Sequence, residues 1–222
     1  MQTALVIGAS RGIGKEFVSQ LLQGNWSVYA SARTPKDIEH LNSLGAKGIV
    51  LDVTDQDSLR SALLSLNKVS LNLVIYVAGI YGPEQGATHA PSAAEFNQVM
   101  HTNVLGAMQS IELLAPALGL SKGKFIFISS LMGSVSATQS SFGWVYRSSK
   151  AALNMCVKAA SFDYPDVICA LMNPGWVRTD MGGSNASISV NQSVSGMLDV
   201  ISRLSIKDSG SFQSYEGRPM QW

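Results

Sequence analysis

Residues 3–14 read TALVIGASRGIG, in which a short apolar run leads directly into three closely spaced glycines. A run of this length is typical of a buried strand, and glycines after it let the backbone turn tightly and approach a ligand. The residues that follow, up to Gly24, show the apolar period of a helix. The segment therefore predicts a strand, a glycine turn and a helix whose free N-terminal amide groups would receive a pyrophosphate.

The glycine turn has alternative interpretations. Its spacing is G-x-x-x-G-x-G rather than the dinucleotide fingerprint G-x-G-x-x-G, so an ordinary tight turn stays open. A phosphate loop is excluded because Ala9 and Glu16 stand where glycine and serine or threonine are required. Residues 8–12 match the G-x-S-x-G motif of hydrolases, but a hydrolase needs a histidine later in the chain, and all 3 histidines lie in the first half. Dinucleotide binding is therefore the preferred interpretation.

Short apolar runs alternate with helical segments along the rest of the chain, which is the pattern of a parallel sheet built from strand-helix-strand units. Strands are predicted at 3–8, 26–31, 47–52, 71–77, 124–129 and 167–172, and helices at 12–24, 35–44, 55–67, 92–118, 145–161 and 190–205. Thr34, Thr54 and Ser92 are expected to cap helix N-termini, and Gly24 and Gly45 to end two helices. We expect a single α/β domain over residues 1–222, a Rossmann-type doubly wound parallel β-sheet flanked by helices on both faces.

Composition argues against several classes of function. The 222 residues are 46% hydrophobic and 14% charged with a formal net charge of +1, which provides no field for a nucleic acid or a membrane surface. Both cysteines lie in apolar stretches, as reduced thiols do in a cytoplasmic protein. We expect no secretory signal, no membrane-spanning segment and no metal site.

The end of the second predicted strand indicates which dinucleotide would bind. An NAD site usually carries an acidic residue there for the ribose hydroxyl, but residues 30–33 read ASAR. Arg33, helped by Ser31 and Arg11, would receive a 2′-phosphate through charge-assisted hydrogen bonds. NADP(H) is therefore the preferred cofactor and NAD(H) the alternative, unless Arg33 is an ordinary solvated cation.

Tyr146 is the only one of the 6 tyrosines that has a lysine, Lys150, four residues later in a helical segment. Residues at this spacing share one face of a helix. An ammonium group near a phenol favours the phenolate and lowers the phenol pKa from about 10, which makes Tyr146 a candidate general acid and base. The same spacing also occurs by chance on exposed helices.

The glycine turn, Asn103, Ser130 and the Tyr146–Lys150 pair occur in this order, and with them the chain resembles the short-chain dehydrogenase/reductase family over nearly its entire length. Further matches are LDV at 51–53, AG at 78–79 and NPGWVRT at 173–179. Within the family the chain is most similar to carbonyl reductases of the sniffer and C-factor type, in the stretches 146–155 and 174–183.

The resemblance implies a catalytic role for four residues. Tyr146 would donate a proton to a carbonyl oxygen as hydride reaches the carbon, and Ser130 would polarise the same carbonyl. Lys150 would lower the pKa of Tyr146 and bind the nicotinamide ribose. Asn103 would hold a water beside Lys150 for proton relay.

The resemblance also implies a cofactor site. Asp52 and Val53 would bind adenine, and Val177 and Thr179 would fix the carboxamide. The residues expected to bind the cofactor are Gly8, Ser10, Arg11, Ile13, Gly14, Arg33, Asp52, Val53, Ala78, Gly79, Tyr146, Lys150, Pro174, Val177 and Thr179.

Two places depart from the family pattern. Ile7 stands where the family usually has threonine, and Tyr76-Val77 stands where it usually has two asparagines. In the family these side chains tie neighbouring strands together, so a joint replacement by apolar groups can be nearly neutral. The longer interval before Tyr146 leaves Ser129 and Ser134 as alternatives to Ser130.

The predicted function is reduction of a hydrophobic aldehyde, ketone or quinone by NADPH, so the partner is a small carbonyl or alcohol substrate. The alternatives are a cofactor-binding signalling or regulatory protein of the C-factor type and an epimerase or dehydratase with the same fold. Residues 182–189 are expected to form a mobile loop or lid. The sequence leaves open whether chains pair through helices 92–118 and 145–161 into a homodimer or homotetramer, as many members of the family that it resembles do. The side chains expected to border the catalytic tyrosine are Trp144, Trp176, Met132, Met181 and Tyr81.

Overall fold

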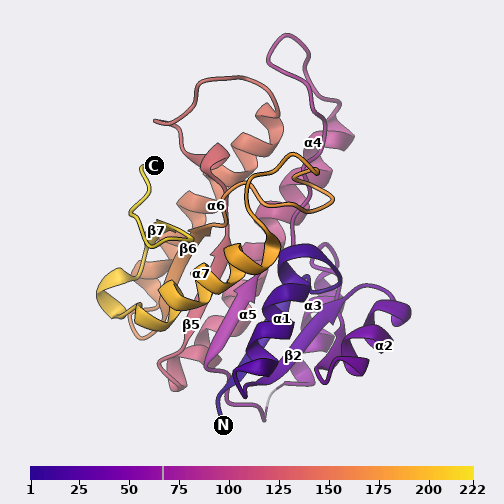
Figure 1. Ribbon diagram of the computed structural model, residues 1–222, viewed down its shortest axis with the longest axis vertical. Coiled ribbons are helices and arrows are strands. Elements are labelled where there is room, and N and C mark those ends of the chain that lie inside the picture. The colour runs from indigo at the N-terminus through magenta and orange to yellow at the C-terminus, as the bar shows by residue number, and fades with distance from the viewer. Residues whose placement is uncertain (67) are drawn as a thin grey trace.

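The computed structural model describes residues 1–66 and 68–222, apart from the side chain of Leu63, and has a seven-stranded sheet at its centre (Figure 1). The strand order is β3-β2-β1-β4-β5-β6-β7, and every neighbouring pair is parallel. The strands are β1 (Thr3–Ile7), β2 (Ser27–Ala32), β3 (Lys47–Val50), β4 (Leu73–Tyr76), β5 (Lys124–Ile128), β6 (Ile168–Asn173) and β7 (Ser211–Ser214). The direction of winding reverses between β1 and β4, and the carboxyl ends of strands at such a point form the ligand crevice of doubly wound folds.

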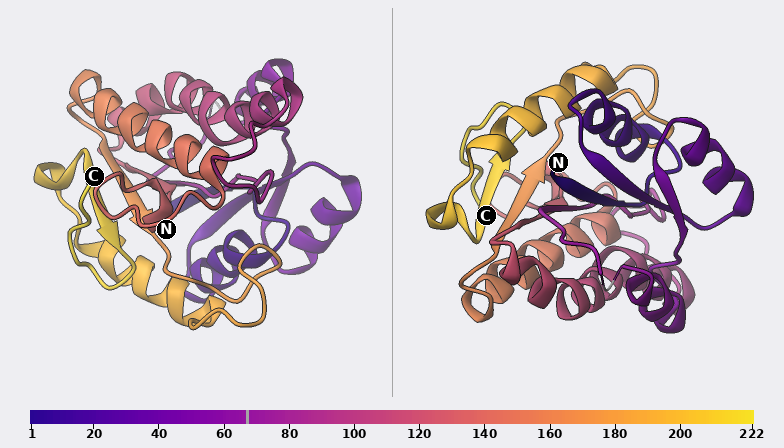
Figure 2. Two further views of the ribbon diagram at one scale, coloured as in Figure 1. Left: turned by 90° about the horizontal axis from the view of Figure 1, so that it is seen from above. Right: turned by 90° about the horizontal axis from the view of Figure 1, so that it is seen from below.

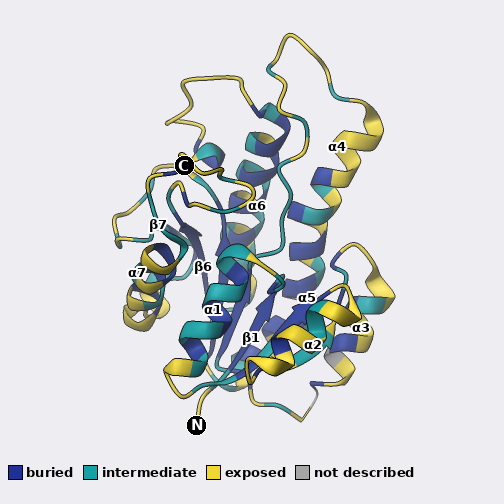
Figure 3. Cartoon of the chain, turned by 45° about the vertical axis from the view of Figure 1, so that its right-hand side comes forward, coloured by how far each residue is buried: buried dark blue, intermediate teal, exposed yellow. Residues whose placement is uncertain are grey.

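Helices cover both faces of the sheet (Figure 2). One apolar cluster joins the sheet to α1, α2 and α7, and a second joins the opposite face to α3, α5 and α6. The four central strands, β1, β4, β5 and β6, are buried on both faces, which explains why they read as nearly continuous apolar runs (Figure 3). The helices are α1 (Gly12–Gln23), α2 (Pro35–Ser43), α3 (Gln56–Leu64), α4 (Ala93–Met100), α5 (Gly106–Leu120), α6 (Trp144–Asp163) and α7 (Val190–Arg203).

The structure confirms the predicted fold class and corrects three local predictions. The segment expected as one helix at 92–118 consists of α4, a π-helical turn over His101–Leu105 and α5. The strand β7 was not predicted, because Phe212 is its only large apolar residue. The predicted cap Thr54 is wrong: Asp55 accepts the first amide hydrogen bonds of α3, from Asp57 and Ser58.

Other helix signals are confirmed. Thr34 caps α2 through the Asp37 amide, and Ser92 and Glu95 form a reciprocal capping box at α4. The predicted helix 55–67 ends at Leu64, and residue 67 lies outside the described residues. Among the helices described, none is both long and apolar enough to cross a bilayer.

Candidate active site

The glycine turn connects β1 to α1 and lies against the end of β4. Gly8 has φ +87°, and a Cβ there would lie 2.7 Å from the Ala78 amide nitrogen, so only glycine fits without a shift. The Gly8 amide donates to the Ser31 hydroxyl at 3.1 Å, and the Ala9 amide donates to the Ser31 carbonyl at 2.8 Å. Ser31 is buried at the end of β2, so its hydroxyl supports the turn and does not face a 2′-phosphate as expected.

The turn leaves the N-terminus of α1 open to a ligand. Arg11 occupies the N-cap position with extended backbone and makes no capping hydrogen bond through its side chain in the described chain. Its guanidinium instead pairs with Asp180 Oδ2 at 2.9 Å, and both side chains are exposed. This ion pair joins the glycine turn to the segment after β6, and Thr179 lies in the same place, 3.3 Å from the position that a Cβ of Gly12 would take.

The ends of β2 and β3 bring Arg33 and Asp52 together. Arg33 is exposed, whereas Val53 is buried. Burial acts to raise the pKa of Asp52, but hydrogen bonds from Thr54 and the charge of Arg33 outweigh it and hold that pKa below its ordinary value. Both Thr54 hydrogen bonds go to Asp52 Oδ1, at 2.9 Å from the amide and 2.7 Å from the hydroxyl.

Tyr146 and Lys150 lie on the first two turns of α6 and are both buried, with exposed fractions of 7% and 4%. The Lys150 ammonium lies 5.6 Å from the centre of the Tyr146 ring and donates to the Ile128 carbonyl at 2.8 Å. Burial lowers the pKa of Lys150 to about 8. Burial also raises the pKa of Tyr146 above its ordinary value, which is the opposite of the effect expected from the ammonium alone.

The three candidate serines differ in what their hydroxyl groups contact. Ser129 is buried and donates to Asn154 Oδ1 at 2.6 Å, and Ser134 is buried near Ser136. Ser130 is partly exposed at the carboxyl end of β5, where its hydroxyl accepts from the Met132 amide at 3.1 Å. Of the three serines, Ser130 is the one whose side chain acts on the Tyr146 phenol, whose pKa it lowers against the larger effect of burial.

Asn103 lies in the π-helical turn and is fully buried. Its Oδ1 accepts from the Ile80 amide at 2.8 Å, and its Nδ2 donates to the Ile80 carbonyl and to the Ser149 hydroxyl, both at 2.9 Å. Ser149 in turn donates to the Tyr146 carbonyl at 2.7 Å. Asn103 therefore connects the segment after β4 to the helix that carries Tyr146 and Lys150.

Aromatic side chains surround the Tyr146 phenol to different degrees. The Tyr81 ring stacks on Tyr146 with centroids 4.7 Å apart, and its hydroxyl lies 3.9 Å from Met132 Sδ. Trp176 is exposed, and its indole nitrogen donates to the Gly182 carbonyl. Met181 is exposed and Trp144 is half-buried. Of the five predicted neighbours, Tyr81 is the one that the structure places directly against the phenol.

The segment after β6 folds back on itself. Val177 pairs with Ile188 in an isolated parallel bridge, and the Arg178 amide donates to the Ile188 carbonyl at 2.9 Å. Pro174 and Val177 are buried and Thr179 is half-buried. These backbone contacts fix both ends of the predicted lid at residues 182–189.

Two contacts at the site were not predicted from the sequence. Asp180 was not predicted to pair with Arg11, because the two residues are 169 positions apart. Asn173 Oδ1 accepts from the Leu131 and Gly175 amides, both at 3.2 Å, and so joins the ends of β5 and β6 beside Ser130. An asparagine at a strand end just before Pro-Gly was the one available hint.

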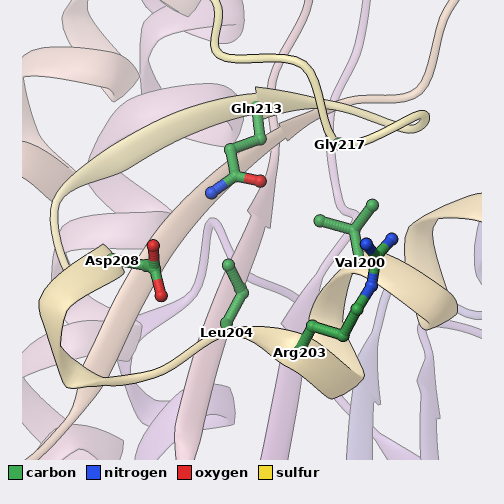
Figure 4. Close-up of a pocket in the computed structure, with 6 residues that line it drawn as sticks. All are labelled: Val200, Arg203, Leu204, Asp208, Gln213 and Gly217. Carbon is green, nitrogen blue, oxygen red and sulfur yellow. The ribbon is translucent and has the colours of Figure 1, made fainter.

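Two hollows in the described part of the chain lie away from the Tyr146 phenol, one of them beside Thr54. One of about 140 Å³ lies between α7 and β7, lined in part by Arg203, Asp208 and Gln213 (Figure 4). The other, of about 620 Å³, is lined by α4 residues, Thr54 and His101. Within the described residues, no group of three or more metal-ligating side chains converges.

Comparison with known proteins identifies the family. A family model described as short chain dehydrogenase matches residues 2–188. The chain belongs to this family. It is accordingly an NAD(P)-dependent oxidoreductase, which confirms the family inferred from the glycine turn and the Tyr146–Lys150 pair.

Individual relatives of this short-chain dehydrogenase support the predicted subgroup. C-signal from Myxococcus xanthus is 38% identical over 134 residues, which cover 58% of this chain and 80% of that protein. The NADPH-bound carbonyl reductase from chicken fatty liver has a TM-score of 0.90 with 34% identity, covering 100% of this chain and 99% of its own. The carbonyl reductase Sniffer of Drosophila melanogaster has a TM-score of 0.92 with 28% identity, covering 100% of both chains.

Proposed function

We propose that the protein is an NADP(H)-dependent carbonyl reductase that reduces a hydrophobic aldehyde, ketone or quinone with Tyr146 as the proton donor. The observation that carries the proposal is the buried pair of Tyr146 and Lys150, whose ammonium lies 5.6 Å from the phenol ring and is held by the last carbonyl of β5, two residues before Ser130. The structural relative crystallised with NADPH supports the choice of cofactor.

The residues present fit a dinucleotide. Gly8 and Gly14 bring the backbone of the turn close to the start of α1, where free amides would bind the pyrophosphate. A Cβ at Gly79 would lie 3.3 Å from Asn103 Oδ1 and 3.6 Å from Lys150 Nζ, so the missing side chain keeps the approach to Lys150 open. Arg33 would bind the 2′-phosphate, because its guanidinium is exposed at the end of β2. When bound, the dinucleotide supplies the hydride.

The chain's own residues would handle the proton and the substrate oxygen. Tyr146 is protonated at neutral pH, since burial raises its pKa further above the ordinary value of 10, and it would donate its phenolic proton to the carbonyl oxygen. Ser130 would donate a hydrogen bond to the same oxygen and stabilise the charge that develops there. Lys150, held by the Ile128 carbonyl, would place its charge near the phenolate that forms.

The test is oxidation of NADPH with a panel of aldehydes, ketones and quinones, on wild type, Tyr146→Phe and the control Tyr164→Phe. Tyr164 is half-buried just after the end of α6, at the opposite end of that helix from Tyr146. Tyr164→Phe therefore removes a phenolic hydroxyl of the same kind from a position without a catalytic role. We expect turnover in wild type and Tyr164→Phe and a loss of at least about a hundredfold in Tyr146→Phe. Turnover retained in Tyr146→Phe would refute the assignment.

A second candidate function is supported by the similarity to C-signal, which favours a cofactor-binding regulatory protein with little turnover. Binding of NADPH without oxidation across the entire panel would favour this function over catalysis.

We also propose that the chain forms a homodimer or homotetramer. Phe96, Met108 and Met155 are exposed apolar residues on α4, α5 and α6, the helices through which the sequence left pairing open. Sedimentation equilibrium of the purified protein tests this, and a monomer at all concentrations would refute it.

A further inference from the structure

Tyr76 is a buried polar residue to which the proposed reaction assigns no role. It ends β4, pairs in register with Ile7 of β1, and is 1% exposed. Its hydroxyl donates to the Thr102 carbonyl at 2.9 Å. Thr102 belongs to the π-helical turn that carries Asn103, so the contact links the sheet directly to that turn.

The π-helical turn changes which donor is available to the Thr102 carbonyl. In an uninterrupted α-helix, the Gly106 amide would donate to Thr102, four residues earlier. Here the Gly106 amide donates to the His101 carbonyl instead. The Thr102 carbonyl thus loses the amide donor that a regular α-helix would give it, and it accepts from the Tyr76 hydroxyl.

Gly106 shows that the phenol and the helix are closely fitted. A Cβ at Gly106 would lie 2.8 Å from the Tyr76 hydroxyl and 2.7 Å from the Val53 carbonyl. A larger residue would therefore displace either the phenol or the helix. Burial also keeps the phenol protonated, because it raises the pKa of Tyr76 further above the ordinary value, and the charge of Asp52 acts in the same direction.

We propose that Tyr76 is a positioning residue that holds the π-helical turn so that Asn103 connects Ile80 to Ser149 of α6. The route runs from the Tyr76 hydroxyl to Thr102, then through Asn103 to Ser149 and the Tyr146 carbonyl. Tyr76 thus maintains the geometry of the Tyr146–Lys150 pair without touching substrate or cofactor. Its effect on turnover rests on the proposed function, whereas its effect on the position of Asn103 does not.

The matched pair of variants is Tyr76→Phe and Ser110→Ala. Tyr76→Phe keeps the ring in the same space and removes only the hydroxyl. Ser110 lies one turn after Gly106 in α5, is also fully buried, and donates its hydroxyl to the Gly106 carbonyl. Ser110→Ala therefore removes a comparable hydrogen bond without affecting the Thr102 carbonyl. A general loss of stability would appear in both variants.

The first readout does not depend on catalysis. The Ile80 amide donates to Asn103 Oδ1, so its hydrogen-exchange protection reports the position of Asn103. We expect protection of Ile80 to fall about tenfold or more in Tyr76→Phe and to remain at the wild-type level in Ser110→Ala. Wild-type protection in Tyr76→Phe, or an equal loss in both variants, would overturn the proposal.

The second readout is turnover with NADPH. We expect kcat to fall about tenfold in Tyr76→Phe with KM for NADPH within about twofold, since misplacement of catalytic groups acts on the chemical step. Combined with Asn103→Ala, Tyr76→Phe should cause little further loss, because both changes break the same route. Fully additive losses would overturn it. If wild type turns over no substrate but Ile80 loses protection in Tyr76→Phe, the proposed function fails and the positioning role stands.

Discussion

Replacing Lys150 by methionine should change how the stability of the fold depends on pH. Burial lowers the pKa of Lys150 from 10.5 in the unfolded chain to about 8 in the fold, so between these values the unfolded state binds more protons. Stability therefore rises with pH across this window, and the penalty present below pH 8 disappears as pH approaches 10.5. At about 1.36 kcal/mol for each pKa unit, the full penalty is about 3.4 kcal/mol, of which about 2 kcal/mol should be relieved between pH 7 and pH 9.5.

Methionine at position 150 has no charge to bury, so Lys150→Met should lack this rise. Loss of the hydrogen bond to the Ile128 carbonyl costs about 1–3 kcal/mol at every pH, so the informative quantity is the change with pH rather than the stability at one pH. Urea unfolding of both proteins from pH 7 to pH 9.5 measures it. Lys158→Met, on the same helix, reports the general effect of exchanging a lysine for methionine. Parallel stability curves for wild type and Lys150→Met would refute a buried Lys150 with a lowered pKa.

Three further changes test the rest of the site. Arg33→Ala should raise KM for NADPH about tenfold or more and leave KM for NADH within about twofold. The control Arg60→Ala, which changes another exposed arginine, should alter neither KM. Equal effects of Arg33→Ala on both cofactors would show that Arg33 does not bind the 2′-phosphate. Asp180→Asn releases Arg11 from an exposed ion pair and so leaves its guanidinium free for the cofactor. KM for NADPH should therefore fall by about two- to fivefold with little change in melting temperature. An unchanged KM would show that Arg11 does not face the cofactor. Tyr81→Ala should admit water to the Tyr146 phenol and so lower the pKa of Tyr146, which moves the alkaline limb of the reduction rate to lower pH. The control Tyr81→Phe keeps the stacked ring and should keep the wild-type pH profile. Coincident pH profiles for Tyr81→Ala and wild type would contradict this.

Much of the fold was predictable because both faces of the sheet are buried. The central strands β1, β4, β5 and β6 are apolar runs buried on both faces, so hydrophobic pattern alone located them, whereas β2 and β3 were located by shorter apolar stretches between two helical segments. The strand β7 had no such run, and it forms because its backbone pairs with β6. The π-helical turn was also hidden, since the apolar period continues through 92–118 and the turn is fixed by Tyr76 and Ile80, which come from a distant part of the chain.

The candidate site was predictable in its residue types and less so in its contacts. The spacing of Tyr146 and Lys150 placed both side chains near each other on one helix, as the structure has them. The direction in which the pKa of Tyr146 shifts was not predictable, because the spacing of two residues predicts that they are close together but not how deeply they are buried. Ser31 shows the same limit: its position after a strand suggested a ligand contact, but its side chain faces the Gly8 amide.

Burial of both groups affects how Tyr146 and Lys150 share the proton in the proposed reaction. A phenol whose pKa is raised is protonated at neutral pH, which is the form that reduction needs, whereas oxidation of an alcohol needs the phenolate. Lys150, with a pKa of about 8, changes protonation state near neutral pH and so can supply its charge when a phenolate has to be stabilised. The burial that penalises the charge of Lys150 in the fold therefore also keeps Tyr146 in its proton-carrying form but makes it a weaker acid, and a charged Lys150 would offset this by stabilising the phenolate. The stability of Lys150 variants and the acidity of Tyr146 thus depend on one physical cause.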